Sequence, residues 1–151
     1  MVAINQEPLH VQRCWDFSQD EKPPYPTIDL WLARSKDESF VKFAFKVDTG
    51  FSGTASLSGK VVDELDLEPY GNTVIATATD IIEVPIYRVL LTQEELRISE
   101  KQVVALGTKR CLVGRMLLTN NCWLLNFIHN KFCLLESDLR KQSLNGAGTA
   151  K

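Results

Sequence analysis

Apolar and polar residues alternate along much of the chain. Residues 27–33 place three apolar side chains on one face, and residues 41–47 alternate in the same way. A period of two predicts half-buried strands, and the polar turn at 35–38 between them predicts a hairpin. Further strands are predicted at 73–78, 83–91, 96–106, 111–113, 123–127 and 132–135, with turns near 79–82 and at Asn130.

Helical periodicity is confined to short stretches. Residues 60–67 put Val61, Val62 and Leu65 on one face, with Ser58 as the expected N-cap. A helical turn is also expected at 116–118. Many short strands with one short helix predict an all-β fold, either a small closed barrel or a sandwich.

The two ends of the chain differ from this central part. Residues 22–26 read Lys-Pro-Pro-Tyr-Pro, which suits neither a helix interior nor a central strand. We therefore expect residues 1–26 to form an irregular N-terminal arm. Residues 138–151 are mostly small or polar and predict a disordered tail. One domain is expected between them, at residues 27–137.

Composition and charge narrow the functional classes. The 151 residues are 44% hydrophobic and carry a formal net charge of −2, which disfavours binding to nucleic acid or to an anionic membrane. The first residues do not resemble a secretory signal, so we expect a cytoplasmic protein. The four cysteines form no metal-ligand pattern, and we expect neither a metal nor a cofactor. In the reducing cytosol the cysteines are expected to be free thiols.

One segment carries candidate chemistry. An apolar strand leads directly into Asp48, Thr49 and Gly50. A strand would fix the carboxylate, and Gly50 would let the chain turn without a side chain beside it. Thr49 can brace the loop by hydrogen bonds. The same triplet could also be an ordinary turn at the end of a strand. The loop continues through Phe51, Ser52 and Gly53.

A second motif follows about sixty residues later. Residues 111–118 contain two apolar residues, Gly114, Arg115 and more apolar residues. With the Asp-Thr-Gly loop before it, this order resembles the retropepsin-like aspartic proteases, over residues 27–136. The resemblance implies a small closed β-barrel that carries half an active site. The chain has a single Asp-Thr-Gly triplet, so an active enzyme would be a homodimer.

The resemblance also implies roles for individual residues. Asp48 of each copy would activate a water molecule that attacks a peptide or protein substrate, and Thr49 would hydrogen-bond across the pair. Gly114 and Arg115 would support the loop structurally. A flap over the substrate would contain Thr77, Ala78, Thr79, Asp80 and Ile81.

Two departures from the family pattern keep alternatives open. The flap segment contains no glycine between residues 72 and 106, and no Asp follows the Asp48 loop to pair with Arg115. The sequence therefore predicts an aspartic endopeptidase, with a non-catalytic peptide-binding or regulatory module on the same fold as the alternative. A third possibility is an unrelated β-barrel in which the triplet is coincidental.

Overall fold

The structure is a computed structural model that describes residues 10–136. The predicted tail at 138–151 lies outside the described residues, as do the first nine residues of the predicted arm. Within the described range, no helix is long and apolar enough to cross a membrane.

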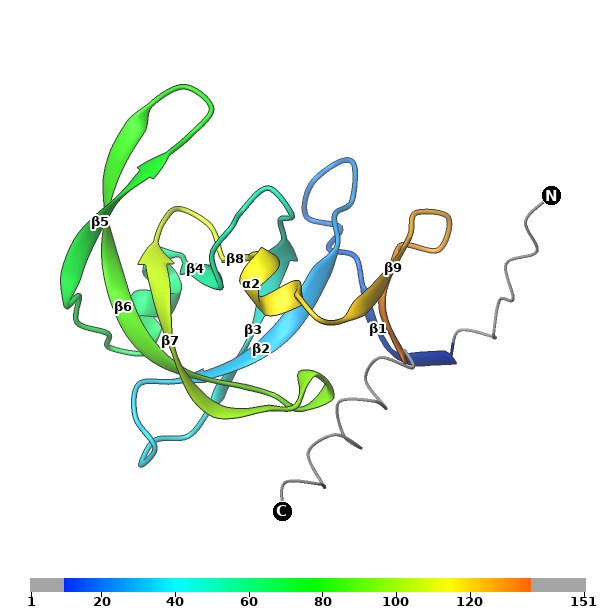
Figure 1. Ribbon diagram of the computed structural model, residues 1–151, viewed down its shortest axis with the longest axis horizontal. Helices are drawn as coiled ribbons and strands as arrows, with labels where there is room; N and C mark the ends of the chain where they lie inside the picture. Colours follow the sequence, from blue (N-terminus) through cyan, green and yellow to red (C-terminus); the bar gives the residue numbers. More distant parts are fainter. Residues whose placement is uncertain (1–9, 137–151) are drawn as a thin grey trace, which may run out of the picture. The chain divides into compact units, whose positions relative to one another are not determined.

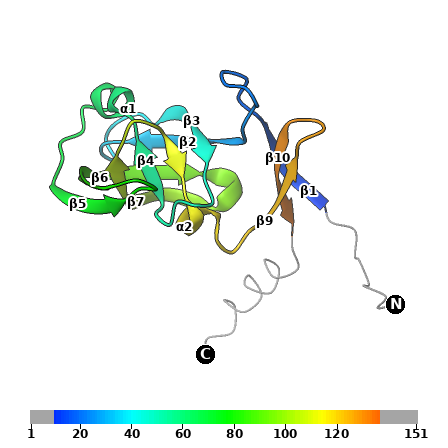
Figure 2. The ribbon, with the colours of Figure 1, turned by 90° about the horizontal axis from the view of Figure 1, so that it is seen from above.

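The described chain divides into two units (Figures 1 and 2). One unit consists of residues 27–119. The other combines residues 10–26 with residues 120–136. The single domain expected at 27–137 is therefore divided after Thr119, and its last two strands group with the N-terminal segment.

Residues 27–119 form a closed barrel of six strands, hereafter the barrel (Figure 1). Around the ring the order is β2 (Thr27–Ala33), β3 (Val41–Val47), β8 (Leu112–Val113), β4 (Ala55–Leu57), β7 (Ile98–Gly107) and β6 (Ile81–Gln93). The ring closes because β2 also pairs with β6. A seventh strand, β5 (Gly71–Ala76), pairs with β6 and ends the sheet. The expected all-β barrel is thus present.

Local alternation explains the first two barrel strands. In β2 the side chains of Ile28, Leu30 and Leu32 are completely buried, as their period of two predicts. In β3 Phe45 is also completely buried, and the two strands pair in antiparallel register. Both strands have the predicted bounds.

The helical segments differ in length from those predicted. Helix α1 spans Gly59–Glu64, and Asp66 beyond it has a positive φ of 51°, which is not helical. The expected cap, Ser58, makes no side-chain capping bond. A 3-10 helix, η1 (Glu94–Leu96), delays the start of β7, because the buried Gln93 side chain accepts a hydrogen bond from the Glu95 N–H. Helix α2 spans Arg115–Leu118, one residue longer than expected.

The second unit contains a three-stranded sheet, hereafter the terminal sheet. Its order is β1 (His10–Asp16), β10 (Lys131–Glu136) and β9 (Cys122–Asn126), all antiparallel. The expectation of an irregular arm is therefore wrong for β1. Its residues lack apolar alternation, and only Trp15 is buried. Its ladder partner lies more than a hundred residues away, so no local pattern reveals it.

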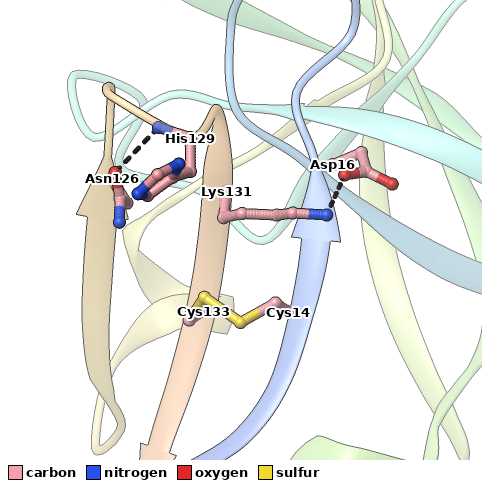
Figure 3. The surroundings of a disulfide bond; sticks show 6 residues. All are labelled: Cys14, Asp16, Asn126, His129, Lys131 and Cys133. Atoms are coloured by element: carbon pink, nitrogen blue, oxygen red, sulfur yellow. Dashed lines mark hydrogen bonds and ion pairs between the residues drawn. A yellow bond between two sulfur atoms is a disulfide. The ribbon is translucent and has the colours of Figure 1, made fainter.

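A disulfide joins the edge strand β1 to the central strand β10 of this sheet. Cys14 of β1 and Cys133 of β10 face each other in register and are bonded (Figure 3). The expectation of four free thiols is wrong for this pair, because the sheet brings together cysteines that are 119 residues apart. Cys111 and Cys122 are free thiols. Near the disulfide, Lys131 forms an ion pair with Asp16 (Figure 3).

Candidate functional site

Asp48 follows β3 directly and is fixed by the barrel. Its N–H donates to the Val113 carbonyl of β8 over 3.0 Å, which continues the parallel pairing of the two strands. The side chain is partly exposed. Its Oδ1 accepts a hydrogen bond from the Gly50 N–H at 2.9 Å. The strand therefore positions the backbone, and the following turn orients the carboxylate.

Gly50 leaves space for this carboxylate. A Cβ atom at Gly50 would lie 3.1 Å from Asp48 Oδ1, which is tighter than most real Cβ contacts. The expected reason for a glycine at this position is therefore visible in the geometry. The neighbouring residues Thr49 and Ser52 are exposed. The bond across the pair that was expected of Thr49 involves a second copy and stays a prediction.

The loop of residues 48–54, hereafter the Asp48 loop, is attached to the second sequence motif. Three successive N–H groups, at residues 114, 115 and 116, donate to the carbonyls of Thr54, Phe51 and Gly53. These bonds measure 3.0, 2.9 and 3.3 Å. The structure therefore brings the Asp-Thr-Gly loop and the Gly-Arg segment together. Main-chain atoms make the attachment, whereas the Arg115 side chain is exposed.

Gly114 is required at this junction by close backbone approach. A Cβ atom there would lie 2.2 Å from the Gly53 carbonyl oxygen and 2.7 Å from that of Phe51. Such contacts do not occur in real structures, so any side chain would displace the Asp48 loop. The family resemblance implied that Gly114 supports the loop. It did not indicate Thr54 or the contacts of Phe51.

The expected flap lies on the hairpin of β5 and β6, which extends beyond the rest of the barrel (Figure 1). Its turn contains no glycine and is closed by Thr77. The Thr77 N–H donates to the Asp80 carbonyl at 2.7 Å, and the Thr77 hydroxyl accepts from the Asp80 N–H at 3.0 Å. None of residues 77–80 has a positive φ, so the turn has no position that favours glycine.

The structure does not join this turn to the Asp48 loop directly. Among the described residues, no hydrogen bond or ion pair links residues 77–81 to residues 48–53. The connection runs through the sheet, from β6 through β7 and β4 to β8. Val74, Ile81 and Ile82 of the hairpin are exposed, and Ile81 retains 70% of its accessible surface.

The described residues contain no group of three His, Cys, Asp or Glu side chains that could hold a metal ion. No family model matches the chain, and no curated protein matches it significantly.

Proposed function

We propose that the protein is an aspartic endopeptidase that acts as a homodimer. The observation that supports this most is the fixation of Asp48. Its backbone is held by β8, its Oδ1 accepts the Gly50 N–H, and its loop is attached to residues 114–116 by three hydrogen bonds. A carboxylate fixed on a rigid element and still partly exposed is suited to general acid–base catalysis.

Two such carboxylates are needed for the reaction. When two copies bring their Asp48 side chains to about 3 Å, the pair shares one proton because both cannot ionise easily. The ionised carboxylate removes a proton from water as the water oxygen attacks the peptide carbonyl carbon. The protonated carboxyl donates to the carbonyl oxygen. The carboxyl that took the proton from water then gives it to the amide nitrogen. The C–N bond breaks as the other carboxylate takes a proton from a hydroxyl of the tetrahedral intermediate, which releases two peptides and leaves one proton on the pair.

The substrate of this proposal is an extended peptide or protein segment. It would lie between the hairpin turn at 77–80 and the two Asp48 loops, paired through main-chain hydrogen bonds. Ile81 and Ile82 offer exposed apolar surface beside that turn. The reaction requires no cofactor.

Cleavage of denatured casein between pH 3 and pH 8 tests the proposal. Asp48→Asn keeps the shape of the side chain but removes the ionisable carboxyl group, so we expect kcat to fall by about 10⁴-fold or more. Asp63→Asn, which alters an exposed carboxylate on α1, is the matched control and should retain activity. Wild-type activity should peak at acidic pH, between the two apparent pKa values of the pair.

A statine-type inhibitor should block the activity, and a metal chelator should not. Equal cleavage by the wild type and Asp48→Asn would contradict the proposal. So would a folded wild-type dimer without activity on any unfolded protein.

A non-catalytic peptide-binding module is the second candidate, and one observation favours it. Strand β5 ends the seven-stranded sheet, and Val74 on it is 63% exposed. An edge strand with apolar side chains can accept an extended peptide as an added strand. Peptide binding that survives Asp48→Asn, without cleavage by the wild type, would favour this candidate.

A further inference from the structure

The Phe51 ring occupies the space that two glycines leave open. A Cβ atom at Gly53 would lie 2.6 Å from Cζ and 2.8 Å from Cε2 of this ring. A Cβ atom at Gly114 would lie 2.7 Å from Cδ1. Real Cβ contacts are essentially never shorter than 3.0 Å. The ring therefore packs directly on the backbone of Gly53, in the Asp48 loop, and of Gly114, at the start of α2.

The backbone of Phe51 links the same two parts. Its N–H donates to the Asp48 carbonyl at 3.2 Å, which closes the turn after the candidate catalytic residue. Its carbonyl accepts the Arg115 N–H at 2.9 Å. One residue thus ends the Asp48 turn, attaches it to α2 and fills the gap between them.

We propose that Phe51 is a positioning residue that sets the direction of the Asp48 carboxylate. The proposal rests on the proposed function, because it concerns the approach of two Asp48 side chains. Without the ring, the backbone hydrogen bonds can persist, but the loop can shift toward Gly114. A displacement near 1 Å in a catalytic group can cost about 10²-fold in rate.

The pH profile separates positioning from a purely structural role. A pair that shares one proton is active between its two apparent pKa values, and mutual repulsion keeps those values apart. When the carboxylates move apart, the repulsion weakens, the lower apparent pKa rises and the upper one falls. A displaced Asp48 therefore gives a narrower pH–rate profile as well as a lower kcat. A structural role alone would lower the amount of folded enzyme without changing the profile.

The experiment measures kcat, KM and the pH–rate profile of the full-length chain with Phe51→Ala and with Phe51→Leu. We expect Phe51→Ala to lower kcat by about 10- to 100-fold, with little change in KM and a narrower profile. Phe51→Leu should recover part of the loss because it refills part of the gap. It also keeps the test open if Phe51→Ala does not fold.

Gly53→Ala supplies a compensating pair. The three atoms nearest to a Cβ at Gly53 all belong to the Phe51 ring. Gly53→Ala alone should therefore lose activity, whereas combining it with Phe51→Ala should be no worse than Phe51→Ala alone. Gly114→Ala is the matched control, because its new Cβ meets backbone oxygens and removing the ring cannot relieve that contact.

The outcomes distinguish this proposal from the proposed function. An inactive wild type overturns both. An active wild type with an unchanged kcat and profile in Phe51→Ala overturns the positioning role alone. An activity loss that follows only the folded fraction, or a Gly53→Ala defect that Phe51→Ala does not relieve, overturns it as well.

Discussion

The barrel and the terminal sheet differ in whether their strands have unpaired edges. In the barrel, β2 pairs with both β3 and β6, so the six strands form a ring. The terminal sheet has three strands, and β1 and β9 are its edges. Closure satisfies the hydrogen-bonding groups of a barrel, whereas a sheet of three strands needs further stabilisation.

A disulfide and packed aromatic rings supply that stabilisation in the terminal sheet. Cys14 and Cys133 are bonded, and the rings of Trp123 and Phe132 stack at 4.6 Å between centroids. The ring centroids of Trp15 and Trp123 lie 6.2 Å apart. Hydrogen bonding around a ring therefore stabilises one unit, whereas a covalent bond and aromatic packing stabilise the other.

Removal of the disulfide should have the largest effect on this comparison. The bond closes a loop of 119 residues, and its loss frees the unfolded chain. Because the folded barrel lies within this loop and keeps most of it ordered, we expect Cys14→Ser and Cys133→Ser together to lower the free energy of unfolding of the terminal sheet by about 2–4 kcal/mol. Denaturant unfolding measures this through Trp15 and Trp123 fluorescence in a Trp31→Phe background, because Trp31 lies in the barrel.

A control follows Trp31 alone, with Trp15 and Trp123 replaced by Phe. Its transition should move less than that of the terminal sheet when the disulfide is removed. Equal shifts in both would contradict the distinction between the two units.

The number of free thiols in the purified protein tests whether the Cys14–Cys133 disulfide is formed. Disulfides persist in oxidising compartments, whereas the expected cytoplasmic location would keep both thiols reduced.

The difference between local patterns in the barrel and distant pairing in the terminal sheet explains how far the sequence predicts the fold. Strands β2 and β3 follow from local alternation, and both have the predicted bounds. Strand β1 and its disulfide depend on a partner beyond residue 130, which single-sequence periodicity cannot reveal. The barrel closure through β2 and β6 was predicted only as a fold class, without its register.

The candidate site likewise contains features that the sequence predicted and features that it did not. Asp48, Gly50 and Gly114 were predicted because their residue types and order carry the information, and the structure brings them together. The position of the Phe51 ring was not predicted, since it depends on how closely two backbones approach. The hairpin turn was predicted near 79–82 and lies two residues earlier, at 77–80, and its closure by the Thr77 hydroxyl was not predicted.

In the barrel, Thr77→Val should have a smaller effect. It removes the hydroxyl that accepts the Asp80 N–H and donates to the Asp80 carbonyl, each over 3.0 Å. We expect a loss of about 0.5–1 kcal/mol in the free energy of unfolding, since exposed hydrogen bonds contribute modestly. Faster amide exchange at Asp80 and a lower denaturation midpoint measure it. Thr77→Ser keeps the hydroxyl and should stay close to the wild type; an equal loss in both variants would contradict the role of the hydroxyl.

The smallest expected effect is a pH dependence in the unit of the terminal sheet. A hydrogen bond from the Ser18 hydroxyl, and a second from Tyr25, lower the pKa of Asp20 below its usual 3.8. A lowered pKa means that the ionised form stabilises the folded state. The contribution is complete above pH 3.8 and is lost as the pH falls through the lower folded value. Asp20 is exposed, so solvent screening keeps the contribution small.

Stability measured at pH 6 and near pH 2.5 checks this, with Asp20→Asn beside the wild type. The wild type should lose its advantage over Asp20→Asn as the pH falls, because the variant carries no charge at either pH. Ser18→Ala should reduce the same difference, since the Ser18 hydroxyl is the first cause of the shift. A constant difference between the wild type and Asp20→Asn would place the source of any acid sensitivity elsewhere.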